Sequence, residues 1–358
     1  MKIVVSGGGT MGSVSPLLAQ IQYLLSHHGF VPGDFLWLGT RSGPERKVVE
    51  NYGIKFQVVS SGKLRRYFSL QNIIDPLKLG RGYIQSLEYL YKFRPDLVIT
   101  TGSYISVPVV YAARTLRQPV LVHQLDLKPG LANKLMARVA DQVTVSWPEL
   151  LNKFPGHSAV WVGTPVRKHI LEPISGTLTP QLNLVAKLPL ILVMGGGTGA
   201  ATINQIIADS LHDLLNRYQV VHLTGANKSV EIKVDKKLKS RYQQFEFVSE
   251  DLGYLMRQAD LIISRAGIGT ISEILLIGKP AVIIPIPDSH QEVNAEYFSK
   301  HGAIKLVAQA GLNPRQLCQE IDDLLQNKDQ QQQLIANGQL LVKKDANELL
   351  AQEILKFK

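Results

Sequence analysis

The chain has almost no cysteine and no long apolar run. Its single cysteine, Cys318, excludes an internal disulfide and a cysteine-based zinc site among the 358 residues, which fits a reducing compartment. No stretch of 18 uninterrupted apolar residues occurs, so the sequence predicts no membrane-spanning helix. The first apolar run, Ile3–Val5, is too short for the core of a signal peptide. We therefore expect a protein that stays in the cytoplasm unless it binds a membrane surface.

Several motifs of metal and hydrolytic chemistry are also missing. The sequence contains no H-E-x-x-H, no zinc pattern and no D-x-D, so we expect neither a metal site nor a metal-bridged diphosphate. The absence of G-x-S-x-G disfavours an α/β-hydrolase. No compact nucleic-acid-binding motif is present either. We expect no bound cofactor and no nucleic-acid partner.

The excess positive charge is concentrated in one half of the chain. The net charge of +10 comes from 39 Lys and Arg against 29 Asp and Glu. Residues 1–163 hold 18 of these basic residues against 9 acidic ones, whereas residues 164–358 hold 21 against 20. A basic half indicates an anionic partner, which can be nucleic acid, acidic lipid or a phosphorylated substrate. A generally basic surface without such a partner is the alternative.

The composition is otherwise that of a two-domain globular protein. Hydrophobic residues make up 45% and charged residues 19% of the chain, which argues against long disorder, and the length is typical of two domains. Short apolar runs alternate with segments of helical spacing, which predicts α/β domains with parallel sheets. Strands are expected at Lys2–Ser6, Phe35–Gly39, Lys55–Val59, Asp96–Thr100, Val120–His123, Pro189–Met194, Val220–Thr224, Phe245–Val248, Leu261–Ser264 and Ala281–Ile286, and helices at Pro16–Ser26, Thr202–Leu215 and Asp345–Phe357.

A strand, a glycine-rich turn and a helix open each half of the chain. The two turns, Gly7–Gly12 and Gly195–Ala200, begin 188 residues apart. This repetition predicts two doubly wound, Rossmann-like domains. Turn-forming residues that start at Gly163 place the boundary there. The predicted domains are therefore residues 1–163 and 164–340, and a last helix in residues 341–358 could pack on either domain, the first included.

Both glycine-rich turns match the dinucleotide-binding fingerprint. Glycines let the backbone approach a pyrophosphate at a helix N-terminus, where free N–H groups and the helix dipole favour anions. The acidic residue that usually binds the ribose after the second strand is absent, because residues 38–41 contain no carboxylate. Arg41 would suit a 2′-phosphate instead, so an NADP-dependent enzyme is one alternative.

The most specific segment is a further strand, turn and helix start in the second half, at residues 261–273. Backbone amides near Gly269 and Thr270 are expected to face an anion such as a diphosphate. Glu273 is expected in the first helical turn, where the dipole favours a carboxylate. There it could accept hydrogen bonds from two ribose hydroxyls. The alternative is a glutamate near a helix N-terminus without any ligand.

A polar segment follows the next buried strand, beyond residue 285. Its Gln291 and Asn294 lie about one helical turn apart and would share a face. Side-chain amides suit sugar hydroxyls because each amide offers both a donor and an acceptor. The carboxyl ends of strands are also where α/β sheets bind ligands. A polar loop without a ligand is the alternative.

A run of basic and aromatic residues lies in the positively charged half, at Lys63–Phe68. Arginine binds phosphate in bidentate fashion, and the apolar side chains of the run suit a membrane interface. We expect Lys63, Arg65 and Arg66 to hold the protein on anionic lipid.

In their order and spacing these segments resemble the MurG family of glycosyltransferases of peptidoglycan synthesis. The resemblance covers most of the chain. It rests on Gly8–Thr10 with Pro16, Leu38–Arg41, Ser61–Arg66, Gly102–Ser106, Gly163–Arg167, Gly195–Ala200, Ser264–Glu273 and His290–Ala295.

The resemblance implies a GT-B fold, in which two Rossmann-like domains flank a cleft, and an inverting, metal-independent transfer. Members of the family move N-acetylglucosamine from UDP-N-acetylglucosamine to lipid I, an undecaprenyl-pyrophosphoryl-linked muramyl-pentapeptide. They work as peripheral proteins at the cytoplasmic face of the inner membrane. The C-terminal domain would hold the donor and the N-terminal domain would meet the anionic acceptor, which agrees with the division of charge.

The resemblance also implies roles for individual residues. The donor site would comprise Arg167, Gly197, Ile268, Gly269, Thr270, Ile271, Ser272, Glu273, Gln291 and Asn294, with Thr10, Met11, Gly12 and Asp126 from the first half. The acceptor and the membrane would be met by Ser13, Lys63, Arg65, Arg66 and Tyr104.

The chain departs from the family pattern at positions that concern proton transfer. Ser13 stands where the family normally has a histidine, and Gly197 stands where a serine is expected. Gln124 and Asp126 replace the glutamate and asparagine of a His-Glu-x-Asn loop. A serine hydroxyl is a poor base near pH 7 unless another base lies beside it. We expect Asp126 to be the general base and His123 to be the second candidate, with a purely structural role as the alternative for this histidine.

These departures leave two alternatives besides the NADP-dependent enzyme. One is a related glycosyltransferase with another lipid-linked acceptor, and the other is a catalytically inactive, UDP-sugar-binding membrane adaptor. The altered positions 13 and 124 favour both of them, whereas the preserved donor segment favours a transferase.

Overall fold

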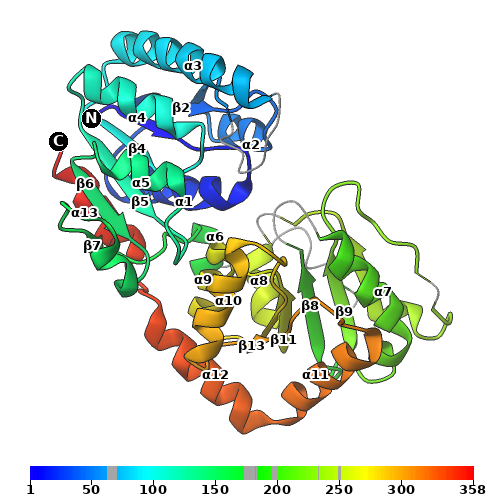
Figure 1. Ribbon diagram of the computed structural model, residues 1–358. Helices are drawn as coiled ribbons and strands as arrows, with labels where there is room; N and C mark the ends of the chain where they lie inside the picture. The colour runs from blue at the N-terminus through cyan, green and yellow to red at the C-terminus, as the bar shows by residue number, and fades with distance from the viewer. Residues whose placement is uncertain (63–70, 173–181, 183, 196–199, 233, 249–250) are drawn as a thin grey trace. The chain divides into compact units, whose positions relative to one another are not determined.

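The computed structural model describes residues 1–62, 71–172, 182, 184–195, 200–232, 234–248 and 251–358 (Figure 1). The chain forms two compact units. The first unit comprises residues 1–167 together with 345–358, and the second comprises residues 168–344. The sequence analysis placed these divisions at 163/164 and 340/341. Each unit contains a single parallel sheet with helices packed on it.

The sheet of the first unit has seven described strands in the order β3-β2-β1-β4-β5-β6-β7, all parallel. The strands are β1 (Ile3–Ser6), β2 (Phe35–Gly39), β3 (Lys55–Val58), β4 (Leu97–Thr100), β5 (Val120–Gln124), β6 (Gln142–Val145) and β7 (Val160–Trp161). The strand order reverses between β1 and β4. In doubly wound sheets, ligands bind outside the carboxyl ends of the strands at such a reversal.

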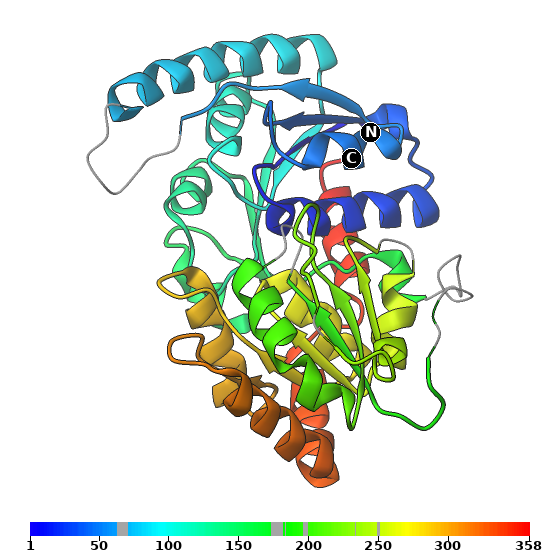
Figure 2. The ribbon, with the colours of Figure 1, turned by 90° about the vertical axis from the view of Figure 1, so that its right-hand side faces the viewer.

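The helices of the first unit connect these strands and cover the sheet. They are α1 (Met11–His27), α2 (Glu45–Asn51), α3 (Gln71–Phe93), α4 (Ser106–Thr115), α5 (Leu131–Ala137) and α13 (Ala346–Leu355), with short 3-10 helices η1 (Pro32–Asp34) and η2 (Pro148–Lys153). Helix α3 packs on α4, and its other side faces outward (Figures 1 and 2).

The second unit repeats the pattern with six described strands in the order β10-β9-β8-β11-β12-β13. Its strands are β8 (Leu190–Met194), β9 (Gln219–Leu223), β10 (Tyr242–Phe245), β11 (Leu261–Ser264), β12 (Ala281–Ile283) and β13 (Lys305–Leu306). Its helices are α6 (Lys168–Leu171), α7 (Ala201–Leu215), α8 (Leu252–Gln258), α9 (Ile268–Ile277), α10 (His290–Lys300), α11 (Pro314–Gln326) and α12 (Lys328–Leu341), with the 3-10 helix η4 (Lys239–Arg241). Here the strand order reverses between β8 and β11.

Most predicted strands are confirmed, but one was placed wrongly and three were missed. The strand expected at Phe245–Val248 lies at Tyr242–Phe245, because Tyr242 is buried and pairs with Val220 whereas Phe247 is 68% exposed. Strands β6, β7 and β13 were not predicted. Two of them are only two residues long, which is too short for a pattern of alternating burial to be read. Helix α1 begins at Met11 and runs through Pro16, where the sequence analysis started it.

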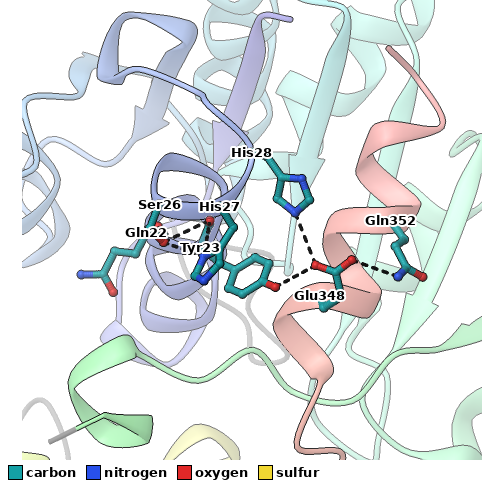
Figure 3. Close-up of polar contacts among 7 residues, drawn as sticks. All are labelled: Gln22, Tyr23, Ser26, His27, His28, Glu348 and Gln352. Atoms are coloured by element: carbon teal, nitrogen blue, oxygen red, sulfur yellow. Dashed lines mark hydrogen bonds and ion pairs between the residues drawn. The ribbon is translucent and has the colours of Figure 1, made fainter.

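The C-terminal helix α13 packs on α1 of the first unit (Figure 2). Leu350, Ala351 and Ile354 belong to the apolar core that α1 and the first sheet share. Polar contacts reinforce this packing (Figure 3). Glu348 accepts hydrogen bonds from the Tyr23 hydroxyl at 2.7 Å and from the Gln352 amide at 3.0 Å, and it lies 3.4 Å from Nε2 of His28.

Asn347, the residue before Glu348, holds the backbone near the division between the units. Its side-chain amide accepts from Val166 N at 2.9 Å and donates to Val166 O at 3.0 Å. Since one amide satisfies both backbone groups of Val166, it fixes the chain just before it leaves the first unit.

Candidate functional site

The first glycine-rich turn joins β1 to α1 beside the strand-order reversal of the first unit. Thr10 is the exposed N-cap residue of α1, and Met11, Gly12 and Ser13 form its first turn. The first N–H groups of a helix have no acceptor inside the helix. Gly9 has a positive φ of 85°, which a residue with a side chain rarely adopts. The turn therefore presents backbone donors at the edge of the sheet where ligands bind.

A buried carboxylate that the sequence analysis missed holds this turn from behind. Glu45, at the start of α2, is 0% exposed. Its carboxylate accepts from Gly9 N at 3.3 Å, from Thr40 N at 2.8 Å and from the Thr40 hydroxyl. A Cβ on Gly8 would lie only 2.2 Å from Oε1 of Glu45, so glycine is needed there. The pattern of residues around position 45 gives no signal for this contact, which depends on the folding of α2 against the turn.

The loop after β4 holds the same turn from the other side. The Ser103 hydroxyl donates to Gly8 O at 2.8 Å, and the Thr101 hydroxyl donates to Ser13 O at 2.6 Å. A Cβ on Gly9 would lie 3.3 Å from the ring of Tyr104. Burial raises the pKa of Tyr104, and the nearby Glu45 carboxylate raises it further. The loop that carries the predicted acceptor residue Tyr104 therefore adjoins the first turn of α1, which carries Ser13.

The loop after β5 carries Asp126, the predicted base. Asp126 is half-buried in a bend just beyond the strand. The Gln124 side chain, 2% exposed, donates to Asp126 O at 2.6 Å. Asn133 of α5 donates to Oε1 of Gln124 at 2.6 Å and to Thr101 O at 3.4 Å. Side-chain amides thus join the loops after β4 and β5.

His123 does not suit the catalytic role that the sequence analysis gave it as the second candidate. The ring is 0% exposed in the middle of the sheet, and burial lowers its pKa to about 3. Nδ1 lies 2.9 Å from the Thr144 hydroxyl, and Nε2 lies 3.1 Å from the Ser146 hydroxyl. With both ring nitrogens engaged and no access to solvent, this histidine is structural.

In the second unit, α9 begins directly after β11, beside the other strand-order reversal. Gly267 is the N-cap residue, so Ile268, Gly269 and Thr270 form the first helical turn and direct their N–H groups out of the helix end. Such a helix end favours an anion. Glu273 is not in the first turn, as the sequence analysis had it, because the helix starts at Ile268. It lies in the second turn and is 5% exposed.

A buried guanidinium lies at the start of this loop. Arg265 is 7% exposed and donates to Ile284 O at 3.1 Å and to Pro285 O at 3.0 Å. Burial lowers its pKa, but an arginine stays charged in proteins. The sequence analysis quoted this residue as part of the segment without giving it a role. The signal in the sequence that could have identified Arg265 is a basic residue directly after a predicted buried strand.

The segment after β12 packs against the same loop. Ser289 caps α10 by accepting from Gln291 N at 3.2 Å. The Gln291 side chain accepts from Ile286 N at 3.2 Å, and the fully buried Asn294 donates to Ala266 O at 3.3 Å. The structure therefore brings the predicted donor residues of α9 and α10 together around one helix N-terminus, with Ile271 buried beneath them.

Several predicted site residues lie elsewhere or outside the described part of the chain. Arg167 is the last residue of the first unit before the chain passes to the second. Gly197, Lys63, Arg65 and Arg66 fall outside the described residues. Within the described ranges, no group of three or more His, Cys, Asp or Glu side chains could hold a metal ion. None of the helices in the described ranges is long and apolar enough to cross a bilayer.

Comparison with known protein families assigns both units. The model of the glycosyltransferase family 28 N-terminal domain matches residues 3–145, and that of the family 28 C-terminal domain matches residues 190–350. The chain belongs to this glycosyltransferase family. The resemblance to MurG is confirmed by curated relatives that carry the name UDP-N-acetylglucosamine–N-acetylmuramyl-(pentapeptide) pyrophosphoryl-undecaprenol N-acetylglucosamine transferase. One from Clostridium botulinum is 36% identical over 337 residues, and one from Bacillus cereus, transferase 2, is 36% identical over 334 residues. Each alignment covers 92% of both chains.

A solved structure supports the same assignment. The crystal structure of Acinetobacter baumannii MurG matches with a TM-score of 0.73 and 25% identity, and the alignment covers 99% of both chains. The predicted GT-B fold of two parallel α/β domains is thus confirmed. The NADP-dependent alternative gives way to this family assignment, and in the first glycine-rich turn the N–H of Gly9 donates to Glu45.

Proposed function

We propose that this chain transfers N-acetylglucosamine from UDP-N-acetylglucosamine to lipid I and so forms lipid II. The observation that carries the proposal is the 36% identity, over 92% of the chain, to relatives named for that transfer. A helix N-terminus with a buried guanidinium behind it, at the strand-order reversal of the second unit, is the kind of site that a nucleoside diphosphate requires.

The donor is proposed to bind at the α9 N-terminus. The N–H groups of Gly269 and Thr270 would donate to the diphosphate, and the charge of Arg265 would add to their field. Glu273 would accept hydrogen bonds from the ribose hydroxyls. Gln291 keeps an amide nitrogen that can donate to a sugar hydroxyl, since only its oxygen is used by Ile286. Asn294 supports the loop through Ala266 O.

The chemical step is proposed to be a single in-line displacement. The acceptor hydroxyl oxygen forms a bond to the anomeric carbon while the bond from that carbon to the diphosphate oxygen breaks, so the configuration inverts. Negative charge grows on the departing UDP, where the α9 N-terminus would stabilise it. Asp126 would take the proton that the acceptor hydroxyl loses, a role that typically contributes about 10²–10⁴-fold to the rate.

The acceptor side is proposed to meet the cytoplasmic face of the inner membrane as a peripheral surface. Leu77, Ile84 and Tyr91 are spaced by seven residues along the outer side of α3, and they are 74%, 67% and 65% exposed. Seven residues make about two helical turns, so these side chains form one apolar stripe. The exposed Lys78 and Arg81 flank it. An apolar stripe with basic neighbours suits an anionic lipid surface.

The experiment that tests the proposal measures UDP release from UDP-N-acetylglucosamine, with and without lipid I in anionic vesicles. We expect lipid-dependent release by the wild type and a loss of at least about 100-fold in kcat for Asp126→Asn. Release that needs a different lipid-linked acceptor would point to a related transferase. Binding of UDP-sugar without any release would point to an adaptor protein without catalytic activity. Undiminished turnover by Asp126→Asn would overturn the role of this residue as base.

A further inference from the structure

The backbone that leads from β5 to Asp126 is fixed at three successive carbonyl groups. Gln124 O accepts from Ser146 N at 2.9 Å, and Leu125 O accepts from the indole nitrogen of Trp147 at 2.9 Å. Asp126 O accepts from the Gln124 side chain at 2.6 Å. The first two bonds come from the segment that directly follows the neighbouring strand β6. The third is the only one of these three bonds that reaches the peptide group of Asp126 itself.

The Gln124 side chain is itself held in one orientation. It is 2% exposed, and its oxygen accepts from Nδ2 of Asn133 at 2.6 Å. This contact assigns the oxygen of the amide to Asn133 and leaves the nitrogen to face Asp126 O. Asn133 can come this close because Gly102 has no side chain, since a Cβ there would lie 2.3 Å from Oδ1 of Asn133.

Only a side-chain amide of this length satisfies both contacts. A glutamate would still accept from Asn133, but its second oxygen would face the carbonyl oxygen of Asp126 and repel it. A methionine would fill a similar volume and make neither bond. The requirement for one donor and one acceptor therefore selects glutamine at position 124.

We propose that Gln124 is a positioning residue that orients the carboxylate of Asp126. Its bond to Asp126 O fixes the peptide plane from which the side chain of Asp126 departs, so that this half-buried carboxylate is presented in one direction. The inference rests on the proposed function in one respect, the role of Asp126 as general base. Misplacement of a reacting group by about 1 Å can cost about 100-fold in rate, so the loss of a single orienting bond has a measurable effect.

The test compares Gln124→Met and Gln124→Glu with a matched control, Gln142→Met. Gln142 also donates to a backbone carbonyl, that of Val143 at 3.0 Å, but it lies at the opposite end of the sheet, where β6 begins. For Gln124→Met we expect kcat for lipid II formation to fall about tenfold or more, with KM for UDP-N-acetylglucosamine within about twofold of the wild type. Gln142→Met should retain the wild-type kcat.

The pH profile distinguishes orientation from general loss of structure. Gln124→Glu introduces a second negative charge close to the proposed base, and repulsion between like charges favours protonation, so the acidic limb of the kcat profile should move to higher pH. Gln124→Met removes a neutral contact and should lower kcat without moving that limb. Wild-type kcat and an unmoved profile in both variants would overturn the proposal, as would equal losses in Gln124→Met and Gln142→Met.

Amide hydrogen exchange supplies a readout that does not depend on turnover. A peptide that covers residues 124–130 should exchange faster in Gln124→Met than in the wild type, whereas Gln142→Met should leave it unchanged. Unchanged exchange in Gln124→Met would overturn the positioning role. If the wild type exchanged as expected but formed no lipid II, the proposed function would fail while the contact between Gln124 and the Asp126 peptide would stand.

Discussion

The two units use the same strand, turn and helix start at their strand-order reversals, but the buried charge behind each helix start has the opposite sign. Behind α1 lies the Glu45 carboxylate, which accepts the Gly9 N–H. Behind the start of α9 lies the Arg265 guanidinium, which donates to two backbone carbonyls that carry no charge to neutralise it. A diphosphate is favoured by the second arrangement and disfavoured by the first. Two strand, turn and helix starts at equivalent places in the two sheets can therefore serve different ligands.

The comparison also explains why the match to a dinucleotide fingerprint was misleading in the first unit. A glycine-rich turn lets other atoms come close to its backbone, and these atoms can belong to a ligand or to the protein itself. At Gly8 and Gly9 the approaching groups are the side chains of Glu45 and Tyr104 from the same chain. The glycines were read correctly as sites of close contact, but the contact is internal.

The largest effect is expected when the buried positive charge of Arg265 in the second unit is removed. Arg265→Met should weaken UDP binding about 10- to 100-fold, because it removes a buried positive charge beside the proposed diphosphate site and an interaction with a charged group contributes about 1.5–3 kcal/mol. Isothermal titration with UDP measures the change. The matched control is Arg241→Met, since Arg241 also donates to two carbonyls, Leu215 O at 2.8 Å and Asn216 O at 3.3 Å, at the far end of α7. Equal weakening by both variants would mean that only structural support was lost.

A smaller and more selective effect is expected in the first unit. Glu45→Gln keeps the size of the side chain but replaces one of its two oxygens with an NH2 group. The three donors, Gly9 N, Thr40 N and the Thr40 hydroxyl, then have one acceptor oxygen instead of two, so the turn from Gly8 to Ser13 should shift. We expect KM for the lipid acceptor to rise about tenfold while the affinity for UDP stays within about twofold, as one charged hydrogen bond is lost. Steady-state kinetics with both substrates varied would measure this.

The control for that variant lies on the same helix. Glu50→Gln removes the exposed pair with Arg46, where the N–O distance is 2.8 Å, and should change neither constant. If Glu45→Gln weakened UDP binding as much as Arg265→Met, the division of ligands between the two turns would be wrong.

The smallest effect concerns the pH dependence of stability, to which one buried histidine in each unit contributes. Burial lowers the pKa of His123 in the first unit to about 3 and that of His222 in the second to about 4. The unfolded chain takes up a proton on each near pH 6.5 while the folded chain does not, so the free energy of unfolding should fall as the pH drops below about 6.5. Between pH 7.5 and 6.0 the loss should be about 1 kcal/mol for each histidine.

Urea denaturation over this pH range would measure the loss. His222→Gln should remove part of the pH dependence, whereas His212→Gln, at an exposed position of α7, should leave it unchanged. If the free energy of unfolding depended on pH in His222→Gln as it does in the wild type, this would contradict the assignment of a buried neutral ring to His222.

The sequence predicted the candidate site only where residues close together in the chain determine both the backbone conformation and the surroundings of the side chain. The helix start at Gly269 and Thr270 was predicted because a buried strand, a glycine turn and a helical pattern follow one another directly. The position of Glu273 was wrong by one turn, because the exact start of a helix depends on its cap residue and sequence patterns place such ends poorly. His123 was offered as a base because its neighbours in the chain do not reveal that Thr144 and Ser146 occupy its ring nitrogens.

The sequence by itself determined the class of the fold, the repetition of a strand, turn and helix in two halves, and the unequal division of charge between them. Those features follow from apolar periodicity and composition, which act over short stretches of chain. Only the tertiary structure decided which buried groups stand behind each turn and which amide holds Asp126. Glu45 and Gly9 are 36 residues apart, and His123 and Thr144 are 21 apart. Contacts of this kind arise when parallel strands bring residues that are distant in the chain side by side, and no local pattern records them.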